Sequence, residues 1–289
     1  MHDVFSHGFS NTPRNNTPVL IWTRAAADLP ADKTFLNALP VDVLHIPCIG
    51  IEPLARPTGL AELSGQNLKK VRPRIAFSSQ NAVKICASWK ETDPEAFSAL
   101  TGCTGIFAHG RKTADLAEKL FAQPVYCVDS PTSEGLAAAL IRDANSESIP
   151  VLWFCGEEVA FDLAAQLEMN RVTCKRIPIY RTATHPTDVD GCRLSAEALA
   201  ELKSKLVMRL AGSKAAICFA SPSAVAGWLE LAGKEAGLAP KFFLAAVIGP
   251  TTARAAAQAG FSSITSCAWP QLADLADLGA QLARAANSR

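Results

Sequence analysis

The sequence contains a degenerate internal repeat, and this repeat limits the possible folds more than any other feature. An apolar run at 243–248 breaks at Gly249 and continues as an alanine-rich helical pattern headed by Thr251 and Thr252. An earlier copy of this layout has Gly110 in the place of Gly249, 139 residues before it. Further matches follow in order along both halves: Val19 with Val151, Ile46 with Ile177, Phe77 with Phe219, Val125 with Ile264 and Pro131 with Pro270. These ordered matches indicate a duplication in which about 19–140 corresponds to 151–282.

Each copy alternates short apolar runs with helical patterns, which is typical of βαβ units and parallel sheets. Ser195 is expected to cap one of the helices, with Glu197 in its first turn. Apolar spacing of three and four predicts helices at Val159, Leu163 and Leu167, and at Leu199, Leu202, Leu206 and Leu210. We expect ten strands, five in each domain, at about 19–22, 41–46, 75–78, 105–108, 125–128, 151–154, 172–177, 215–220, 243–248 and 263–267.

Length and composition agree with two packed domains. The chain has 289 residues, about twice the length of a typical domain, and 49% of them are hydrophobic. The formal net charge of +1 provides no electrostatic field for nucleic acid or for an anionic membrane surface. We therefore expect an anionic ligand to be held by local hydrogen-bond donors.

The chain carries no sign of export or membrane insertion. Residues 1–16 are polar, and we expect a flexible tail without a signal peptide. No apolar segment is long enough to span a bilayer. The nine cysteines form no Cys-x-x-Cys pair, and several lie in apolar runs, as Cys218 does. Buried, reduced thiols and a cytoplasmic location are the interpretation that fits best.

Two proline-bearing stretches, 46–51 and 177–182, do not fit a βαβ unit, because a proline cannot donate to a strand ladder. We interpret them as crossings between domains. The first strands would then join the C-terminal half of the chain. This predicts a discontinuous domain of 17–46 with 182–289, a second domain of 53–175, and linker strands at 47–52 and 176–181.

Polar residues gather where the predicted strands end. In doubly wound sheets the ligand lies beyond the carboxyl ends of the strands. Taken singly, each cluster is more simply a helix cap or a tight turn. Together they favour a binding site whose candidate residues are Thr23, Arg24, Ser78, Ser79, Asn81, Gly110, Thr113, Gly156, Ser221, Ser223, Gly249, Thr251 and Thr252.

Other common chemistries have little support in the sequence. There is no Gly-x-Gly-x-x-Gly after a strand, no Walker motif and no Gly-x-Ser-x-Gly elbow. The five histidines lack metal-ligand spacing, and His109, beside a turn glycine, is more simply structural. We therefore predict neither a metal nor an organic cofactor.

In this order the motifs resemble those of the uroporphyrinogen-III synthase family. The resemblance covers nearly the whole chain after the tail. It is most specific at Ile248–Ala253, with the sequence IGPTTA, and it departs at Cys155, where the family often has arginine before the glycine. The other matching segments are Thr23-Arg24, Phe77–Val83, Gly110–Ala114, Ile179–Thr182 and Phe219–Val225.

The resemblance implies two flavodoxin-like, doubly wound domains joined by a two-stranded linker, with the substrate between them. It implies cofactor-independent closure of hydroxymethylbilane, a linear tetrapyrrole octacarboxylate, to uroporphyrinogen III, with inversion of ring D through a spiro intermediate. Tyr180 is then the candidate proton donor to the departing hydroxyl, and Thr251 and Thr252 would hold substrate carboxylates. A monomer, with transient contact to the preceding pathway enzyme, is the expected state.

Two rival interpretations remain from the sequence. The same pair of domains also suits a non-catalytic ligand-binding or regulatory protein. The arginine missing before Gly156 leaves open a degenerate synthase that acts as a partner protein.

Overall fold

The computed structural model describes residues 17–54, 72–128, 132–144, 149–159, 161–211 and 214–287. The expected tail at 1–16 and the matched Pro131 lie outside these described residues. The chain forms two compact units: unit 1 comprises Met1–Ile51 with Ala183–Arg289, and unit 2 comprises Glu52–Thr182.

Unit 1 is built around a five-stranded sheet with the order β11-β10-β9-β1-β2, in which every neighbouring pair is parallel. Apolar residues of α1 and α11 pack on one face of this sheet, and those of α8, α9 and α10 pack on the other. The strands are β1 (Val19–Trp22), β2 (Asp42–His45), β9 (Ala216–Phe219), β10 (Leu244–Val247) and β11 (Ser263–Ser266). The helices are α1 (Leu29–Leu36), α8 (Ala196–Leu210), α9 (Pro222–Ala232), α10 (Pro250–Gln258) and α11 (Leu272–Asn287), with 3-10 turns at Ala26–Asp28, Ala236–Leu238 and Pro240–Phe242.

Unit 2 contains a six-stranded sheet with the order β3-β8-β7-β4-β5-β6. Residues of α3, α4 and α5 pack on one face, and residues of α6 and α7 pack on the other. The strands are β3 (Gly50–Pro53), β4 (Arg74–Phe77), β5 (Gly105–Ala108), β6 (Val125–Cys127), β7 (Val151–Gly156) and β8 (Cys174–Ala183). The helices are α3 (Gln80–Thr92), α4 (Pro94–Thr101), α5 (Arg111–Phe121), α6 (Ser133–Asp143) and α7 (Leu163–Met169).

The internal repeat is visible in the strand registers. Arg74 pairs with Gly105 in unit 2, and the corresponding Ala216 pairs with Leu244 in unit 1. The sequence offsets of 142 and 139 residues relate these two pairs residue by residue. Ile106 with Val125 and Ala245 with Ile264 match in the same way. This agreement confirms the predicted duplication.

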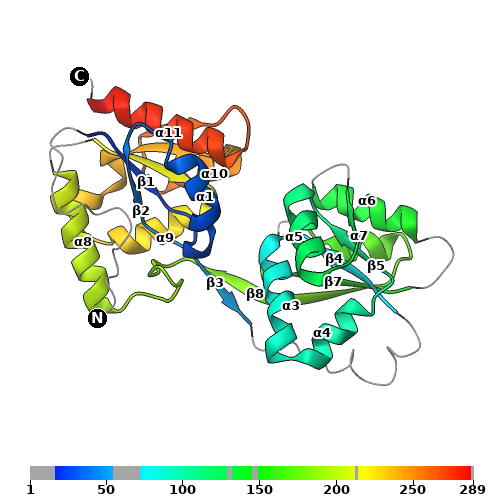
Figure 1. The fold of residues 1–289 in the computed structure, drawn as a ribbon. Helices are drawn as coiled ribbons and strands as arrows, with labels where there is room; N and C mark the ends of the chain where they lie inside the picture. The colour runs from blue at the N-terminus through cyan, green and yellow to red at the C-terminus, as the bar shows by residue number, and fades with distance from the viewer. Residues whose placement is uncertain are drawn as a thin grey trace. The chain divides into compact units, whose positions relative to one another are not determined.

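The two copies exchange their first two strands. In unit 1, β1 and β2 of the first copy join β9, β10 and β11 of the second, and Figure 1 shows these blue strands among yellow and orange elements. In unit 2, β7 and β8 of the second copy join β4, β5 and β6 of the first. Numbered by position within a copy, these five strands follow the order 2-1-3-4-5 in both sheets, which is the flavodoxin-like order. The predicted fold class is confirmed.

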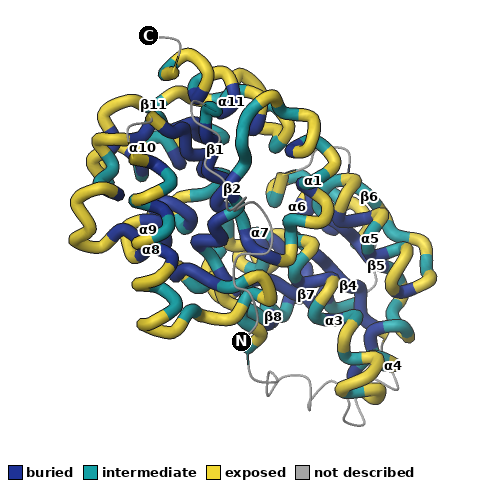
Figure 2. The backbone as a smooth tube through the Cα atoms, turned by 60° about the vertical axis from the view of Figure 1, so that its left-hand side comes forward, coloured by how far each residue is buried: buried dark blue, intermediate teal, exposed yellow. Residues whose placement is uncertain are grey.

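The central strands have few polar side chains because helices cover both faces of the sheets. All residues of β1, β4, β7 and β9 are buried, and in Figure 2 they form the dark interior of each unit. In a sequence, a parallel strand buried on both faces forms a short continuous apolar run. These strands were predicted from that pattern. Serine caps start several of the surrounding helices, and Ser195 caps α8 as predicted, accepting from Ala198 N at 3.2 Å.

The number of strands and the end of one strand differ from those expected. The strand expected at 172–177 continues to Ala183, and Pro178 lies inside its ladder with β7. The register shifts between Cys155 and Gly156, and such an irregularity accommodates a residue that cannot donate. Within the described residues β3 is an eleventh strand; it overlaps the predicted linker strand at 47–52 and neighbours β8, and Leu54 N donates to Ile179 O at 2.9 Å.

Two smaller expectations also need correction. Val159 precedes α7, which begins at Leu163 after the capping residue Asp162, although Val159 still packs against the same core cluster. The cysteines are all free, but only five of the nine are buried; Cys192 is exposed, and three others are partly exposed. The expectation of buried thiols therefore holds for five of the nine cysteines.

Candidate active site

Tyr180 belongs to the unit 2 sheet, near the carboxyl end of β7. It pairs with Gly156 across the β7–β8 ladder, and its carbonyl accepts from Glu157 N at 2.7 Å. The Tyr180 hydroxyl lies 2.9 Å from Ser79 Oγ. Ser79 is the N-cap of α3 and accepts from Ala82 N at 3.2 Å. The phenol is therefore hydrogen-bonded to a serine that is itself fixed at a helix N-terminus.

Gly156 makes room for the Tyr180 ring. A β-carbon at this position would lie 3.2 Å from Cε2 and Cζ of Tyr180 and 3.3 Å from its hydroxyl oxygen. These separations are shorter than ordinary van der Waals contact, so a larger residue would push the ring away. The glycine that was predicted to bind substrate thus has a packing role that the sequence did not reveal.

Burial raises the pKa of Tyr180 above its ordinary value of 10.0, although the hydrogen bond from Ser79 opposes this shift. The phenol is therefore protonated at neutral pH and can donate a proton. If Ser79 donates to the phenol oxygen, the Tyr180 O–H is left to point at a ligand. The same Ser79 hydrogen bond would stabilise the phenolate once that proton has left.

Three further side chains lie beside this site, and the sequence analysis did not assign them to it. Trp153 donates through Nε1 to Ser78 Oγ at 3.2 Å, and His109 donates through Nδ1 to the Ser78 carbonyl at 3.1 Å. Arg176 donates to the carbonyl of Glu157, and its guanidinium lies 5.8 Å from the centre of the Trp153 ring. Only the polar residues at strand ends carried a signal in the sequence. Arg176 and Trp153 lie within β8 and β7, where nothing set them apart from core residues.

The remaining unit 2 candidates lie at the starts of α3 and α5. Gly110 precedes α5 with φ of 80°, a backbone conformation that favours glycine. Thr113 N donates to Gly110 O at 3.1 Å, and the Thr113 side chain is buried, with 6% exposure. Asn81 in α3 is partly exposed. Asn81 and Gly110 thus lie near the surface, whereas the Thr113 hydroxyl lies under it.

The unit 1 candidates occupy equivalent positions. Ser221 caps α9 and accepts from Ala224 N at 3.2 Å, and Ser223 follows in the first turn. Gly249 precedes α10 in extended backbone. Thr251 is exposed, but Thr252 is only 3% exposed. Of the two threonines, Thr251 is therefore the one whose hydroxyl is open to a ligand.

Thr23 and Arg24 follow β1, and both are already engaged by other residues of unit 1. Thr23 is fully buried, and its hydroxyl donates to Cys218 O at 2.6 Å. Arg24 forms ion pairs with Asp28 at 2.8 Å and with Asp32 at 2.6 Å. Substrate contact by Arg24 stays a prediction, and an anionic ligand would have to compete with these two carboxylates.

Asp32 and His45 complete this cluster. Asp32 accepts from Trp22 Nε1 at 2.9 Å, and burial raises the pKa of its carboxyl despite the nearby Arg24. His45 Nε2 donates to Arg24 O at 2.9 Å, and burial lowers the pKa of its imidazole. The backbone and the side chain of Arg24 are therefore both held in place.

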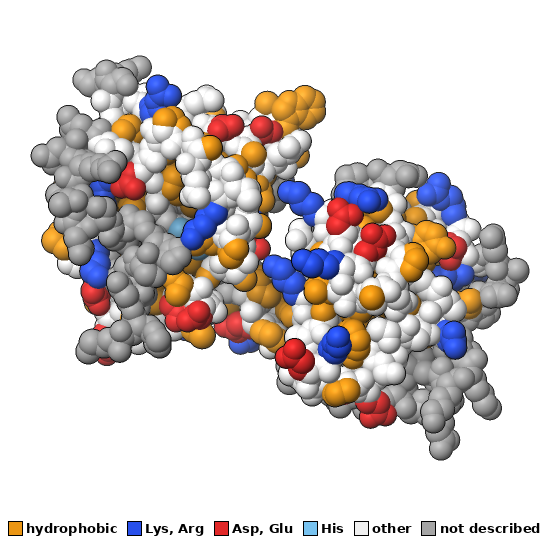
Figure 3. Space-filling view, viewed as in Figure 1, with side chains coloured by type: hydrophobic (Ala, Val, Ile, Leu, Met, Phe, Trp, Pro, Cys, Tyr) orange, Lys and Arg blue, Asp and Glu red, His pale blue; other side chains and the backbone are white. Residues whose placement is uncertain are grey.

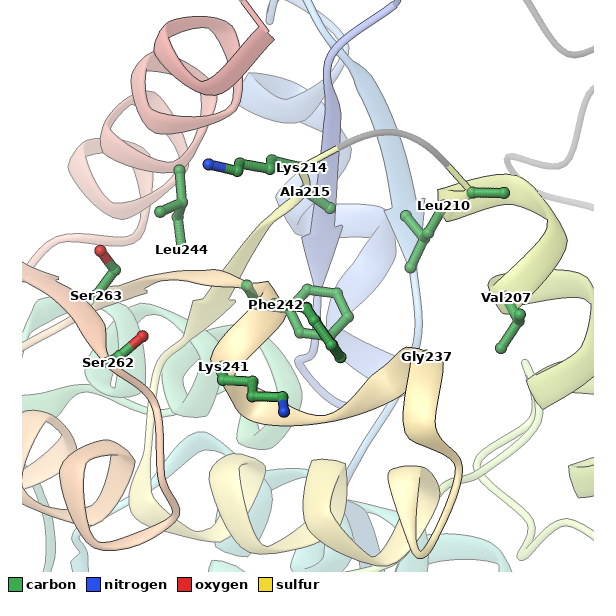
Figure 4. Close-up of a pocket in the computed structure, with 12 residues that line it drawn as sticks. Val207, Leu210, Lys214, Ala215, Gly237, Lys241, Phe242, Leu244, Ser262 and Ser263 are labelled. Carbon is green, nitrogen blue, oxygen red and sulfur yellow. The ribbon is translucent and has the colours of Figure 1, made fainter.

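One cavity of unit 1 lies away from all these residues, at the amino ends of its strands. It has a volume of about 560 Å³, and its lining includes Lys214, Lys241, Phe242 and Ser263 (Figure 4). It opens beside the first residues of β9, β10 and β11. It is thus distinct from the carboxyl edge, where the candidate residues lie.

No group of three or more His, Cys, Asp or Glu side chains is placed to hold a metal ion within the described residues. Among the same residues, no helix is both long and apolar enough to cross a membrane. On the face shown in Figure 3, positive and negative side chains are interspersed in each unit.

Comparison with known proteins identifies the family. Among solved structures, a uroporphyrinogen-III synthetase from Helicobacter pylori is 16% identical with a TM-score of 0.60, and the match covers 92% of this chain and 99% of that one. A mutant uroporphyrinogen III synthase from Thermus thermophilus is also 16% identical, with a TM-score of 0.51 and coverage of 93% and 99%. No curated protein matches. The family described as Uroporphyrinogen-III synthase HemD matches residues 33–277, and this protein therefore belongs to that family.

Proposed function

We propose that the protein closes hydroxymethylbilane to uroporphyrinogen III with inversion of ring D, a cyclising lyase reaction of haem biosynthesis. The observation that carries this proposal is the family match over residues 33–277. The resemblance further implies a spiro intermediate and chemistry that needs no metal or organic cofactor. In that chemistry loss of the hydroxyl gives a reactive azafulvene, so the enzyme mainly has to direct ring closure.

Tyr180 is the proposed proton donor to the departing hydroxyl. Its raised pKa keeps the phenol protonated, and Ser79 lies within hydrogen-bond distance of its oxygen. The Tyr180 O–H bond breaks as the substrate hydroxyl leaves as water, and the phenolate then accepts from Ser79. A proton returns to Tyr180 before the next turnover, and the ring closure itself releases one.

The proposed role of the other candidates is to hold substrate carboxylates. The N-termini of α3, α5, α9 and α10 present backbone N–H groups at the carboxyl edges of the two sheets, and the positive end of a helix dipole favours an anion. Thr251 adds an exposed hydroxyl next to one of these termini. The substrate has eight carboxylates, and many separate hydrogen-bond donors suit them better than a few fixed cations would.

The proposed function also implies a domain arrangement, an oligomeric state and a location in the cell. We propose that 17–46 with 182–289 and 53–175 act as two domains joined by linker strands at 47–52 and 176–181. The protein would act in the cytoplasm as a monomer and would make transient contact with the enzyme that supplies hydroxymethylbilane. Sedimentation at micromolar concentration tests the monomer, and a dimer would refute it.

The deciding experiment supplies freshly prepared hydroxymethylbilane and separates the products by isomer. The spontaneous reaction gives the type I product, so type III above that background is the expected result. A folded protein that binds the bilane and yields only type I would refute catalysis and favour the non-catalytic binding protein.

A further inference from the structure

One tryptophan is exposed at the carboxyl edge of the unit 1 sheet. Trp269 is 69% exposed, whereas Trp22, Trp153 and Trp228 are at most 1% exposed. Trp89 is partly buried. Exposure alone would carry little, since single apolar side chains are common on protein surfaces. Trp269 differs from an ordinary exposed side chain in its position at the strand ends and in the hydrogen bonds of its backbone.

The chain leaves β11 beside the end of β10. Cys267 N donates to Val247 O at 3.0 Å. Trp269 follows Cys267 by two residues, and Gly249 follows Val247 by two residues. The segments that carry Trp269 and Gly249 therefore leave neighbouring strands at the same edge of the sheet, one toward α11 and the other toward α10.

The backbone of Trp269 is anchored although its side chain is exposed. Pro270 follows it and disfavours helical backbone at the tryptophan. Trp269 O accepts from Gln271 N at 2.8 Å, and Leu275 N donates to Gln271 O at 3.0 Å at the start of α11. Leu275 is fully buried in the core under this face of the sheet. A ligand that meets the indole would thus have little backbone to order, which lowers the cost of binding.

We propose that Trp269 stacks on a pyrrole ring of the linear tetrapyrrole at the carboxyl edge of unit 1. This deepens the proposed function and rests on it. The bilane is amphipathic: its pyrrole rings have apolar π faces, and its rim carries carboxylates. The exposed indole offers a face to a ring, while the N-terminus of α10 and Thr251 offer donors to a carboxylate of the same molecule.

Phe242 is a matched control. It is another exposed aromatic residue of unit 1, with 51% exposure, but it lines the cavity at the amino ends of the strands (Figure 4). Replacing it also removes an exposed aromatic ring, but at the opposite edge of the same sheet. Its variant therefore reports on general effects of removing a surface ring.

The first measurement is the KM for hydroxymethylbilane, with type III formation by the wild type as the check on the proposed function. Trp269→Ala should raise KM roughly 3- to 10-fold, the range expected for one aromatic pair. Trp269→Phe retains a ring and should stay within about twofold of the wild type. Phe242→Ala should leave KM unchanged, and circular dichroism should show all three variants folded.

The second measurement does not depend on turnover. Acrylamide quenches exposed tryptophans, so it should reach Trp269 in the free protein far more than the buried indoles. Bound uroporphyrinogen III, kept reduced and colourless, should protect that emission in the wild type. Trp269→Phe should lack the protected fraction.

Several results would overturn the inference. An unchanged KM in Trp269→Ala, an equal rise of KM in Trp269→Phe, or quenching unaffected by bound uroporphyrinogen III would each do so. A rise of KM in Phe242→Ala alone would move the ring contact to the amino-edge cavity. If the wild type forms no type III product, the proposed function fails, and the quenching result still decides whether Trp269 meets the tetrapyrrole.

Discussion

Ser79→Ala tests whether the serine that caps α3 also assists Tyr180. The substitution removes one oxygen with two recorded contacts, one to Ala82 N at 3.2 Å and one to the Tyr180 hydroxyl at 2.9 Å. We expect lower stability and lower turnover, with uroporphyrinogen III still the product. Ser195→Ala is the control, because Ser195 caps α8 at the same 3.2 Å distance and belongs to no proposed site.

The two contacts set the size of the effect. Loss of a serine N-cap costs about 1 kcal/mol, and loss of a neutral hydrogen bond costs about 1 kcal/mol more. Ser79→Ala should therefore destabilise the fold by about 2 kcal/mol, and Ser195→Ala by about 1 kcal/mol. In the proposed proton transfer the phenol oxygen gains negative charge, and a hydrogen bond to a charged oxygen is stronger. We expect turnover to fall roughly tenfold, which corresponds to about 1.4 kcal/mol.

The assay is a double-mutant cycle with Tyr180→Phe, measured as the rate of type III formation. Tyr180→Phe alone should lower turnover roughly 10- to 100-fold, at or below the usual effect of losing one general acid, because departure of the hydroxyl is already facile. Adding Ser79→Ala to Tyr180→Phe should then change little, because the phenol oxygen that Ser79 assists is gone. If Ser79→Ala lowers turnover by the same factor in both backgrounds, Ser79 acts independently of Tyr180 and the reasoning is refuted. Chemical denaturation of each variant supplies the stability values.

Three other substitutions test separate parts of the structure. Thr251→Val should weaken substrate binding roughly 10- to 100-fold, because an exposed hydroxyl that can donate to a carboxylate is lost. The type I fraction should then rise, and isomer analysis that shows a wild-type ratio would contradict this. Burial lowers the pKa of His45 from 6.5, so the stability that the neutral imidazole contributes is full above pH 6.5 and is lost as pH falls through the lower folded-state pKa. Denaturation curves should therefore show less acid sensitivity in His45→Gln than in the wild type, and equal sensitivity would count against the assignment. Gly227→Ala should destabilise the fold by about 3 kcal/mol or more in thermal unfolding, because the new β-carbon would lie 1.7 Å from the Cys48 carbonyl oxygen. Alanine normally favours a helix, so a stabilised variant would show that this contact relaxes freely.

Much of the fold followed from local patterns. Strands buried on both faces leave short apolar runs, and the repeat offsets fixed which turns correspond, so that the pairing of Arg74 with Gly105 recurs as Ala216 with Leu244. The exchange of strands is harder to predict, because each copy offers an equivalent place for β1 or β7. Pro178 misled the strand prediction, since the sequence does not reveal the irregularity that accommodates it, an extra β8 residue between the partners of Cys155 and Gly156.

The site was less predictable than the fold, because a serine at a strand end carries the same signal whether it caps a helix, binds a ligand or does both. Ser79 and Ser221 illustrate this, since both cap a helix at 3.2 Å and only Ser79 has Tyr180 beside it. Arg24 is a second example: the sequence suggests an anion contact, but it does not reveal that the side chain pairs with Asp28 and Asp32, four and eight residues along the chain. The sequence thus showed which residue types lie at the strand ends, but it did not show which partner each side chain contacts.

The repeat also explains why the two sheets are proposed to have different tasks. At the offset that matches Ile46 with Ile177, Tyr180 corresponds to Ile49 of the first copy, which has no hydroxyl. At the offset that matches Val19 with Val151, Gly156 corresponds to Arg24, whose side chain is held by carboxylates. The duplication therefore supplied two capped edges, but a phenol that can give up a proton lies only in unit 2. Unit 1 instead presents an exposed threonine and an exposed tryptophan, the groups suited to holding a carboxylate and a ring.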